Sequence, residues 1–512
     1  MKALEVPEIL WLIGRFLDYP RLAAARTVCK SWNTIFTPFL YHTLEWAEYN
    51  WCHPRSSVVK ERADHIRFIK ISYYSWIPSL AHCTHLEGLH LKFDYDAQDP
   101  WTPLTNLVRQ NPRLVTLCAI RPSIEFLKAV FTCSPQLKRL EISDPDLVAF
   151  AMDDPFFNVC LRLEELKVLD LNMDIESDDT SWIQWPAAFP TIKKLWIGFT
   201  QEWIPSQLQH QHEFIQRCPN LESLTWSFSG PRFPIHEIKD LLSPKTSPCP
   251  RINAFAFHCR TSRSDWPVNM LVEILKTCNN NLTSFESDGV QFEELYGHTL
   301  INCLASSLTR LHLNNCGSRT SGPLMKILSS CPHLLRVHCA GLLHAQDILG
   351  IDHSKATRWK AWYHQDQPPP ESIHPPEWAC KNLQILEIGI CGLQYTGWQR
   401  GVLKQLAKLK QLRVLDVANY TDITQERYQD GLDFRLTSGL DILSSLTLLE
   451  TLGFYSLWQA MAKQDIEWMI KTWPRLSSVC GRVHHSASER IELEKIFKRH
   501  GIAVDHLRVL AA

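Results

Sequence analysis

The sequence contains no C-x-x-C pair, no long uncharged hydrophobic run and almost no net charge. Its 512 residues carry a formal net charge of −1, so no overall field attracts nucleic acid or an anionic membrane. No uncharged segment reaches the ~18 residues that a membrane span requires. The 17 cysteines lie in a chain far too long for a small disulfide scaffold. We therefore expect a soluble intracellular protein with reduced, largely buried thiols.

The motifs of common catalytic sites are also missing. The sequence contains no P-loop, no G-x-G-x-x-G, no G-x-S-x-G and no H-E-x-x-H. The 22 histidines are scattered, and the pairs His210–His212 and His484–His485 lack partners at zinc spacing. We expect no metal, no cofactor and no catalytic centre, and an enzyme is the least favoured class of function.

The first 45 residues contain helical patterns with more apolar surface than a small unit can bury. In residues 4–17, apolar side chains occupy every face of a helix: Val6, Ile9, Leu10, Trp11, Leu12, Ile13, Phe16 and Leu17. A second helix is expected to align Leu22, Ala25, Cys29 and Trp32, and Pro38 is expected to end the helix that follows. Three short helices are seldom stable alone, so the surplus apolar surface indicates a docking surface.

The order of residues in this unit resembles an F-box. The series is Leu4-x-x-Pro7-Glu8-Ile9-x-x-x-Ile13-x-x-x-Leu17-x-x-x-x-Leu22, then Val28-Cys29-Lys30-x-Trp32. Val6 departs from the usual Leu-Pro, and residues 31–38 are similar to fungal F-box proteins in particular. The resemblance implies docking on a Skp-type adaptor, which joins the chain to a cullin and a RING subunit. The adaptor-binding residues that it implies are Leu4, Pro7, Glu8, Ile9, Ile13, Leu17, Leu22, Val28, Cys29 and Trp32.

One apolar pattern recurs from residue 66 onward: an apolar residue, two variable, an apolar, one variable, an apolar. Clear copies begin at Leu86, Leu137, Leu166, Leu308, Leu383 and Leu412, and weaker ones at Ile66, Leu114, Ile192, Leu221, Ile252, Leu282, Leu334, Leu449 and Leu476. Nine intervals span the 248 residues from Leu86 to Leu334, about 28 residues each, which is typical of leucine-rich repeats. The last two apolar residues of each copy should point inward from a short strand, and their neighbours outward.

Proline marks the segment before many of these strands. The pairs are Asn111-Pro112, Cys218-Pro219, Cys249-Pro250, Cys331-Pro332 and Trp473-Pro474, with Cys133-Ser-Pro135 as a variant. Proline cannot continue a helix, and the preceding stretches, such as residues 271–276 and 324–328, have helical patterns. We expect an α/β fold: a short helical F-box followed by a curved leucine-rich-repeat solenoid with parallel concave strands and convex helices.

These patterns divide the chain into an F-box unit (1–45), a linker (46–65) and a solenoid of about fifteen repeats (66–512). The interval from Leu334 to Leu383 is long and contains a Pro-rich stretch at residues 364–376. We expect residues 345–377 to leave the solenoid as a loop, either as a passive insertion or as a lid over the binding face. A smaller insertion is expected at residues 425–438.

Outward positions of consecutive strands predict a charged patch that binds the substrate. Its expected residues are Glu286, Asp288, Arg310, His312, Asn314, Arg336 and His338. Arg310 should stand beside Arg336, and His312 beside His338. The two acidic residues either balance this charge or leave the arginines available for an acidic or phosphorylated segment.

Two functions fit these observations. The first is the substrate receptor of an SCF-type ubiquitin ligase in the cytoplasm or nucleus, which holds a protein target near a ubiquitin-charged enzyme. The second is a non-catalytic scaffold whose N-terminal helices only cap the solenoid. Adaptor binding that requires residues 1–45 would distinguish the first function from the second.

Overall fold

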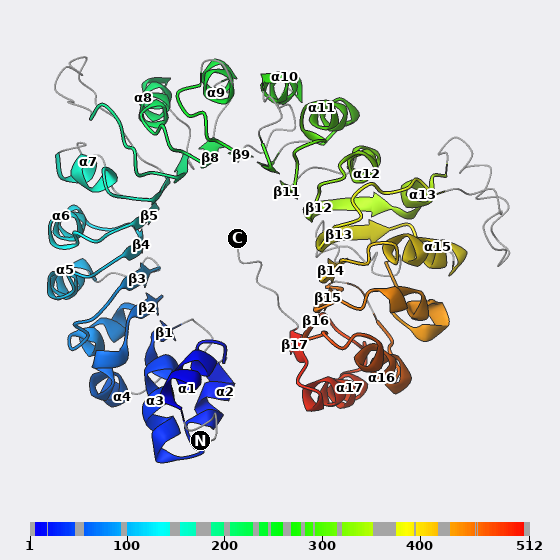
Figure 1. Cartoon of the computed structure of the whole chain (residues 1–512), viewed down its shortest axis with the longest axis horizontal. Coiled ribbons are helices and arrows are strands. Elements are labelled where there is room, and N and C mark those ends of the chain that lie inside the picture. Colours follow the sequence, from blue (N-terminus) through cyan, green and yellow to red (C-terminus); the bar gives the residue numbers. More distant parts are fainter. Residues whose placement is uncertain are drawn as a thin grey trace. The chain divides into compact units, whose positions relative to one another are not determined.

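Strands and helices alternate along the chain in the computed structural model (Figure 1). The structure describes residues 6–17, 19–46, 56–93, 100–143, 154–169, 186–198, 205–228, 235–243, 247–259, 268–277, 282–289, 292–314, 320–351, 375–393, 396–417, 431–455, 457 and 459–505. The chain divides into two compact units, residues 1–230 with 248–251 and residues 231–247 with 252–512. Each unit has the architecture of an α/β repeat solenoid, and three helices precede the strands of the first.

The strands described in the first unit are parallel and follow sequence order. They are β1 (Thr43–Trp46), β2 (Phe68–Ile71), β3 (Gly88–Leu91), β4 (Thr116–Ile120), β5 (Arg139–Ser143), β6 (Glu165–Leu169), β7 (Lys194–Gly198) and β8 (Ser223–Phe228). Each pairs with the next. The connections contain α4 (Ser56–Glu61), α5 (Trp101–Gln110), α6 (Ile124–Cys133), α7 (Asp154–Cys160) and α8 (Pro205–Gln216). Strand β1 thus joins the sheet before residue 66, where the recurring pattern starts.

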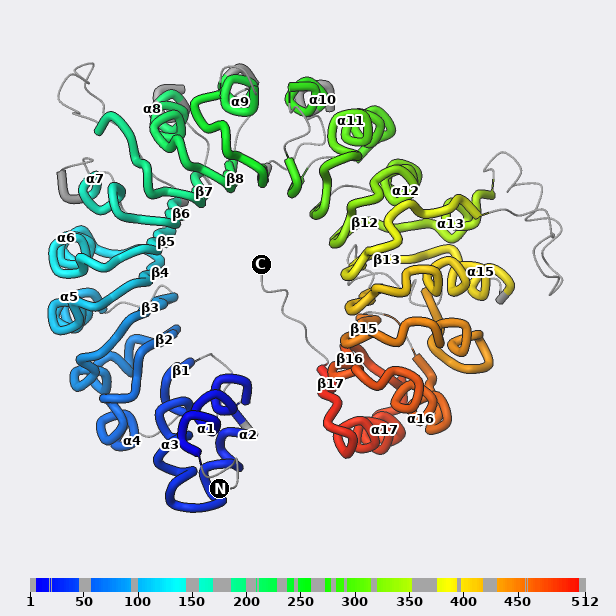
Figure 2. The backbone as a smooth tube through the Cα atoms, viewed as in Figure 1, coloured from blue at the N-terminus to red at the C-terminus, as the bar shows by residue number. Residues whose placement is uncertain are grey.

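The second unit repeats this arrangement. Its described strands are β9 (Ala254–Cys259), β10 (Ser284–Asp288), β11 (Arg310–Asn314), β12 (Arg336–His344), β13 (Ile385–Cys391), β14 (Val414–Asp416), β15 (Thr451–Gly453), β16 (Ser478–Cys480) and β17 (Ala503–Asp505), each paired with the next. Its helices are α9 (Ile235–Leu242), α10 (Val268–Thr277), α11 (Glu294–Leu304), α12 (Ser321–Ser330), α13 (Ala345–Leu349), α15 (Thr396–Leu406), α16 (Lys463–Thr472) and α17 (Ala487–Arg499). In Figure 2 the chain of each unit passes back and forth between the strands and the helices.

The recurring apolar pattern corresponds to strands β2 to β16. Except for β6, each of these strands begins two residues after the first apolar residue of its copy. The inward positions form the core: Leu311 and Leu386, for example, are 1% and 0% exposed. Full burial of such a side chain contributes about 1.5–3 kcal/mol to stability. Each repeat is therefore stabilised mainly by its neighbours in the stack.

The register of β6 differs from the prediction. Its partners place Leu166 opposite Leu140 and Val168 opposite Ile142, so these two residues are the inward pair. The copy therefore begins at Leu163, which is fully buried, and not at Leu166. Two overlapping copies of the pattern exist here, and pairing with β5 and β7 selects the first. The side chain of Leu169, which was predicted to lie in the core, is outside the described residues.

Both predicted insertions are shorter than expected. Strand β12 continues to His344, and residues 345–349 form helix α13 rather than a loop. Helix α13 ends at Gly350, whose φ of 70° suits glycine. Within the range 425–438, Phe434 is fully buried and its backbone N–H donates to Gln459 Oε1 at 2.9 Å. Residues 352–374 and 418–430 lie outside the described residues.

A buried position recurs three residues before the first apolar residue of the repeat. Cysteine occupies it in six repeats: Cys83, Cys160, Cys218, Cys249, Cys331 and Cys380, all buried. In another repeat it is Asn111, whose side chain accepts from the Leu86 backbone N–H and donates to the Cys83 carbonyl, both at 2.7 Å. Burial raises the pKa of Cys331 to about 11 and that of Cys380 to about 12.

We expect these buried cysteines to resist alkylation while the protein is folded. Iodoacetamide at pH 8 should modify exposed Cys29 at least roughly 100-fold faster than Cys331, because the thiolate is the reactive species and Cys331 is both inaccessible and protonated. Peptide mass spectrometry after timed quenching measures both rates, and urea-unfolded protein is the control. Similar rates for the two residues in the folded chain would contradict the assignment of Cys331 to the core.

Candidate functional site

Helices α1 (Pro7–Gly14), α2 (Tyr19–Ala25) and α3 (Lys30–Tyr41) form a small apolar core of their own. Its buried residues are Leu10, Leu22, Phe36 and Leu40. Helices α1 and α3 approach each other closely at Gly14, where an added Cβ would lie 2.8 Å from the ring of Phe39. This packing buries Leu10 and Gly14 of α1 and leaves Ile9, Trp11 and Leu12 exposed.

The helix boundaries differ from the predicted ones at two residues. Helix α2 ends at Ala25, and Cys29 is the N-cap of α3 because its extended backbone lets Sγ accept from the Trp32 backbone N–H at 3.5 Å. Pro38 does not end a helix: α3 continues through it to Tyr41. The buried side chains of Phe36 and Leu40, one turn apart, keep the helix packed on both sides of the proline.

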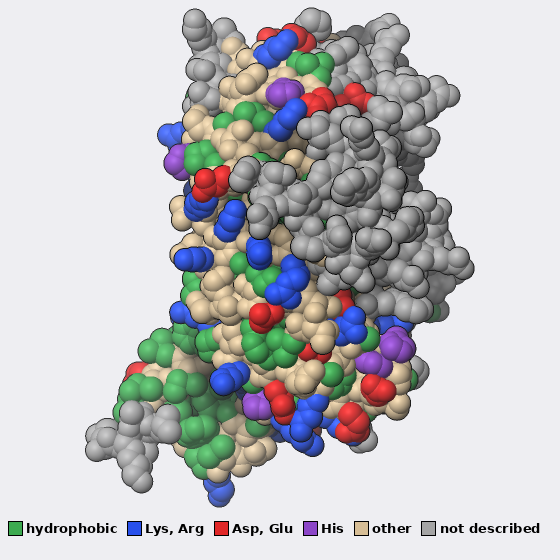
Figure 3. Space-filling view, turned by 90° about the vertical axis from the view of Figure 1, so that its right-hand side faces the viewer, with side chains coloured by type: hydrophobic (Ala, Val, Ile, Leu, Met, Phe, Trp, Pro, Cys, Tyr) green, Lys and Arg blue, Asp and Glu red, His purple; other side chains and the backbone are tan. Residues whose placement is uncertain are grey.

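Helix α1 and the residues directly after it expose large apolar side chains. Trp11 is 50% exposed, Leu12 52% and Phe16 84%. The indole of Trp11 is nevertheless positioned, because its ring meets that of Phe39 edge-on at 5.7 Å and the guanidinium of Arg15 lies 5.0 Å from its centre. Hydrophobic side chains also gather on this helical unit at the lower left of Figure 3.

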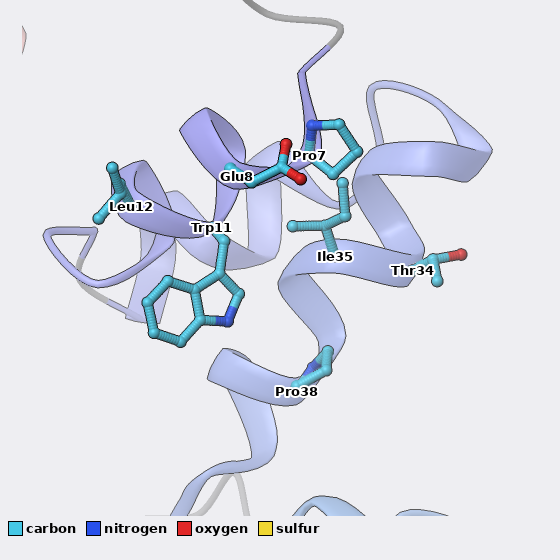
Figure 4. Close-up of a pocket in the computed structure, with 7 residues that line it drawn as sticks. All are labelled: Pro7, Glu8, Trp11, Leu12, Thr34, Ile35 and Pro38. Atoms are coloured by element: carbon cyan, nitrogen blue, oxygen red, sulfur yellow. The ribbon is translucent and has the colours of Figure 1, made fainter.

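A groove of about 580 Å³ runs between α1 and α3. It is lined by Pro7, Glu8, Trp11, Leu12, Thr34, Ile35 and Pro38. Figure 4 shows the Trp11 indole extending toward the part of α3 that carries Pro38, and Pro7 next to Ile35. The groove is mainly apolar with one carboxylate at its edge, which suits an apolar helix or loop of a partner.

The predicted adaptor residues occupy different positions in this unit. Pro7 and Glu8 line the groove; Ile9, Val28 and Cys29 are exposed. Leu22 belongs to the core, and Ile13, Leu17 and Trp32 are partly buried and pack against it. These four therefore hold the helices in place and contribute less to the exposed surface. Leu4 lies outside the described residues.

Sequence reasoning did not assign five of the groove residues to the site: Trp11, Leu12, Thr34, Ile35 and Pro38. The signal for the first two was present, because both interrupt the amphipathic pattern of α1 with apolar side chains. The three on α3 were missed because the sequence does not show which face of this helix lies against α1.

A comparison with known families identifies these helices. Residues 7–45 match the F-box-like family. The match covers α1 to α3 and reaches into β1. No curated protein matches the chain. An F-box-like domain suggests a role in substrate recognition by a ubiquitin ligase, since such domains generally bind Skp-type adaptors.

The second candidate region lies on the exposed face of strands β10 to β13. The register pairs Arg310 with Arg336 and His312 with His338, as the sequence predicted. Both arginines are exposed, and the two imidazole rings meet edge-on with centres 4.3 Å apart. Asp288 pairs in register with Asn314 at the ends of β10 and β11. The predicted patch residues therefore do lie together on one face.

Glu286 contacts histidines in this region. Its Oε1 lies 3.3 Å from His258 Nε2 and 3.3 Å from His312 Nδ1. Burial raises the pKa of this carboxyl, but the hydrogen bonds of the two imidazoles outweigh burial and lower it to about 2. Conversely, burial lowers the pKa of His312, yet its hydrogen bond with Glu286 and the charge of that residue produce a net increase. His338 Nδ1 lies 2.9 Å from Glu387 Oε2.

Replacing Glu286 by glutamine is expected to lower the pKa of His312. In the native chain this pKa is raised, so the contribution of the pair to stability is present below about pH 6.5 and is lost as pH rises through the folded-state pKa. Without the carboxylate, burial dominates and favours the neutral ring. NMR titration of labelled histidines, with His312→Gln for assignment, measures the change. An unchanged His312 titration in Glu286→Gln would show that the contact does not form.

Two further kinds of feature are absent from the described residues. They contain no group of three or more His, Cys, Asp or Glu side chains that could hold a metal ion. No helix formed by these residues has the length and apolarity needed to cross a membrane. Of the histidine pairs noted in the sequence, His484 and His485 stack on each other, and His484 Nε2 lies 3.1 Å from Glu489 Oε2.

Proposed function

We propose that this chain is the substrate-recognition subunit of an SCF-type ubiquitin ligase. In this function the F-box-like helices bind a Skp-type adaptor, and the exposed face of the parallel sheet binds the target protein. The observation that supports it most is the F-box-like match of residues 7–45 together with the exposed apolar groove on the same helices. The recurring apolar pattern on strands β2 to β16 supports the assignment of the sheet to leucine-rich repeats.

The proposed mechanism is positioning. This mechanism requires no nucleophile, acid or base from the chain; it raises the effective concentration of target lysines near the ubiquitin-charged enzyme. Stacked repeats suit this task because each unit is a continuous ladder of strands rather than a set of loosely joined modules.

The groove argues against the alternative of an N-terminal cap. A cap protects the end of a solenoid and presents a polar outer surface to water. Here α1 exposes Trp11 and Leu12, and Phe16 just after the helix is exposed as well; such a concentration of apolar surface is typical of an interaction site and not of a polar cap.

Co-purification of the full chain with a Skp-type adaptor tests the proposal. The complex is then reconstituted with a cullin and a RING subunit, and ubiquitin transfer to a captured target is measured. Point variants in the groove are preferable to deletion of residues 1–45, because α3 packs on β1 and the deletion would remove part of that strand. A full chain that fails to bind the adaptor would refute the proposal.

A further inference from the structure

Charged residues at neighbouring outward positions of the first unit are paired with opposite charges. In the register, residues on adjacent strands form rows across the exposed face. Lys167 Nζ lies 2.8 Å from Glu141 Oε1. In the adjoining row, Glu165 lies between Arg139 and Lys194, with a 3.7 Å contact to each. Such cross-strand pairs favour the sheet, by up to about 1 kcal/mol each.

Arg310 and Arg336 break this rule in the second unit. They occupy the same kind of outward position on adjacent strands, and their neighbours in the row are Ser284 on β10 and Ile385 on β13. Among the residues that the structure describes, no carboxylate forms a salt bridge with either arginine. The carboxylates two positions along the neighbouring strands, Glu286 on β10 and Glu387 on β13, contact histidines instead.

Two arginines side by side do not stabilise a sheet. Like charges at directly opposite positions are unfavourable, so folding alone gives no reason for this pair. The arrangement does suit an anion: strands lie ~4.8 Å apart, and two guanidinium groups at that spacing can each donate two hydrogen bonds to one phosphate or carboxylate. The hydroxyl of Ser284 adds a donor on one side, and Ile385 offers an apolar contact on the other.

We propose that Arg310, Arg336 and Ser284 bind a phosphorylated or acidic side chain of an extended target segment. This inference rests on the proposed function, since it names the chemistry of the target that the sheet would recognise. A carboxylate and a phosphate each present at least two oxygens that can accept hydrogen bonds from paired arginines. The segment lies across the strands, with its anionic group over the arginines and an apolar side chain near Ile385.

Binding of peptide pools to the full-length chain tests this inference. Three biotinylated pools have the same random flanks and a central phosphoserine, glutamate or serine. Biolayer interferometry should show at least roughly tenfold tighter binding of the phosphoserine or glutamate pool than of the serine pool, because an uncharged hydroxyl cannot engage both arginines. The preferred pool identifies phosphate or carboxylate as the ligand. Equal binding of all three pools to the native chain would overturn the proposal.

The double variant Arg310→Gln with Arg336→Gln should reduce binding of the preferred pool at least roughly tenfold. Its midpoint of thermal unfolding should be unchanged or higher, because the repulsion between the two arginines is removed. Arg139→Gln with Lys194→Gln is the matched control, because it removes two positive charges from the same kind of row where Glu165 already pairs with them. An equal loss in both double variants, or no loss in the first, would overturn the site.

The peptide assay does not involve the adaptor, so the two proposals can fail separately. A chain that binds the adaptor but none of the pools selectively refutes the anion site and leaves the proposed function standing. A chain that binds the anionic pool through Arg310 and Arg336 but no adaptor supports the site and refutes the ubiquitin-ligase function.

Discussion

Replacing Trp11 and Leu12 together by aspartate is expected to weaken binding of a Skp-type adaptor roughly 100-fold or more, because a large aromatic anchor in an interface commonly contributes 2 kcal/mol or more. Both side chains line the groove and are about half exposed, so they are available to a partner. Aspartate removes their apolar area and adds a charge that the partner would have to desolvate. Surface plasmon resonance with immobilised adaptor measures the change.

The chain offers a closely matched control for this variant. Leu295 and Ile491 are each 51% exposed, and both lie on helices outside the F-box-like unit. Leu295→Asp with Ile491→Asp should therefore keep adaptor affinity within about twofold, since isolated exposed apolar residues are ordinary on protein surfaces. If both double variants bind the adaptor like the native chain, the groove is not the docking surface.

Truncation of Leu311 or Leu386 to alanine is expected to destabilise the second unit by about 2–5 kcal/mol, the usual cost of removing a buried leucine side chain. Both are buried, Leu311 on β11 and Leu386 on β13. Because a chain with two units need not unfold in one step, hydrogen exchange of peptides from β11 to β13 is the appropriate measurement.

Arg310→Ala provides the contrast for Leu311→Ala, since the two residues are adjacent on β11 and point to opposite faces. The arginine variant should change stability by no more than about 0.5 kcal/mol. If exchange in β11 responds equally to both substitutions, the distinction between inward Leu311 and outward Arg310 is wrong.

The repeat fold could be predicted because its apolar spacing is a direct consequence of strand geometry. Fifteen copies of the pattern correspond to strands β2 to β16. Strand β17 was missed because Gly501 stands where the pattern requires an apolar residue, and its φ of 75° is a turn conformation. For β6 the sequence allowed two registers, and only pairing with neighbouring strands could select one.

Less of the two candidate sites could be predicted from the sequence. The surplus apolar surface of α1 followed from its helical pattern, but the α3 residues of the groove did not, because they depend on how α3 packs against α1. The row that joins Arg310 and Arg336 followed from strand register alone. The contacts of Glu286 could not be predicted from the register. Its partner on β9 in the register is Ala256, but its carboxylate reaches His258, two positions further along that strand.

The direct pairing of β12 with β13 bears on how this protein can be engineered. The two strands keep their ladder although residues 352–374 separate them in sequence. The entropy of closing a connection grows slowly, by about 0.6 kcal/mol for each doubling of its length. A fluorescent protein or an epitope tag inserted within that connection is therefore expected to leave the pairing of β12 with β13 intact, which offers a labelling position inside the chain.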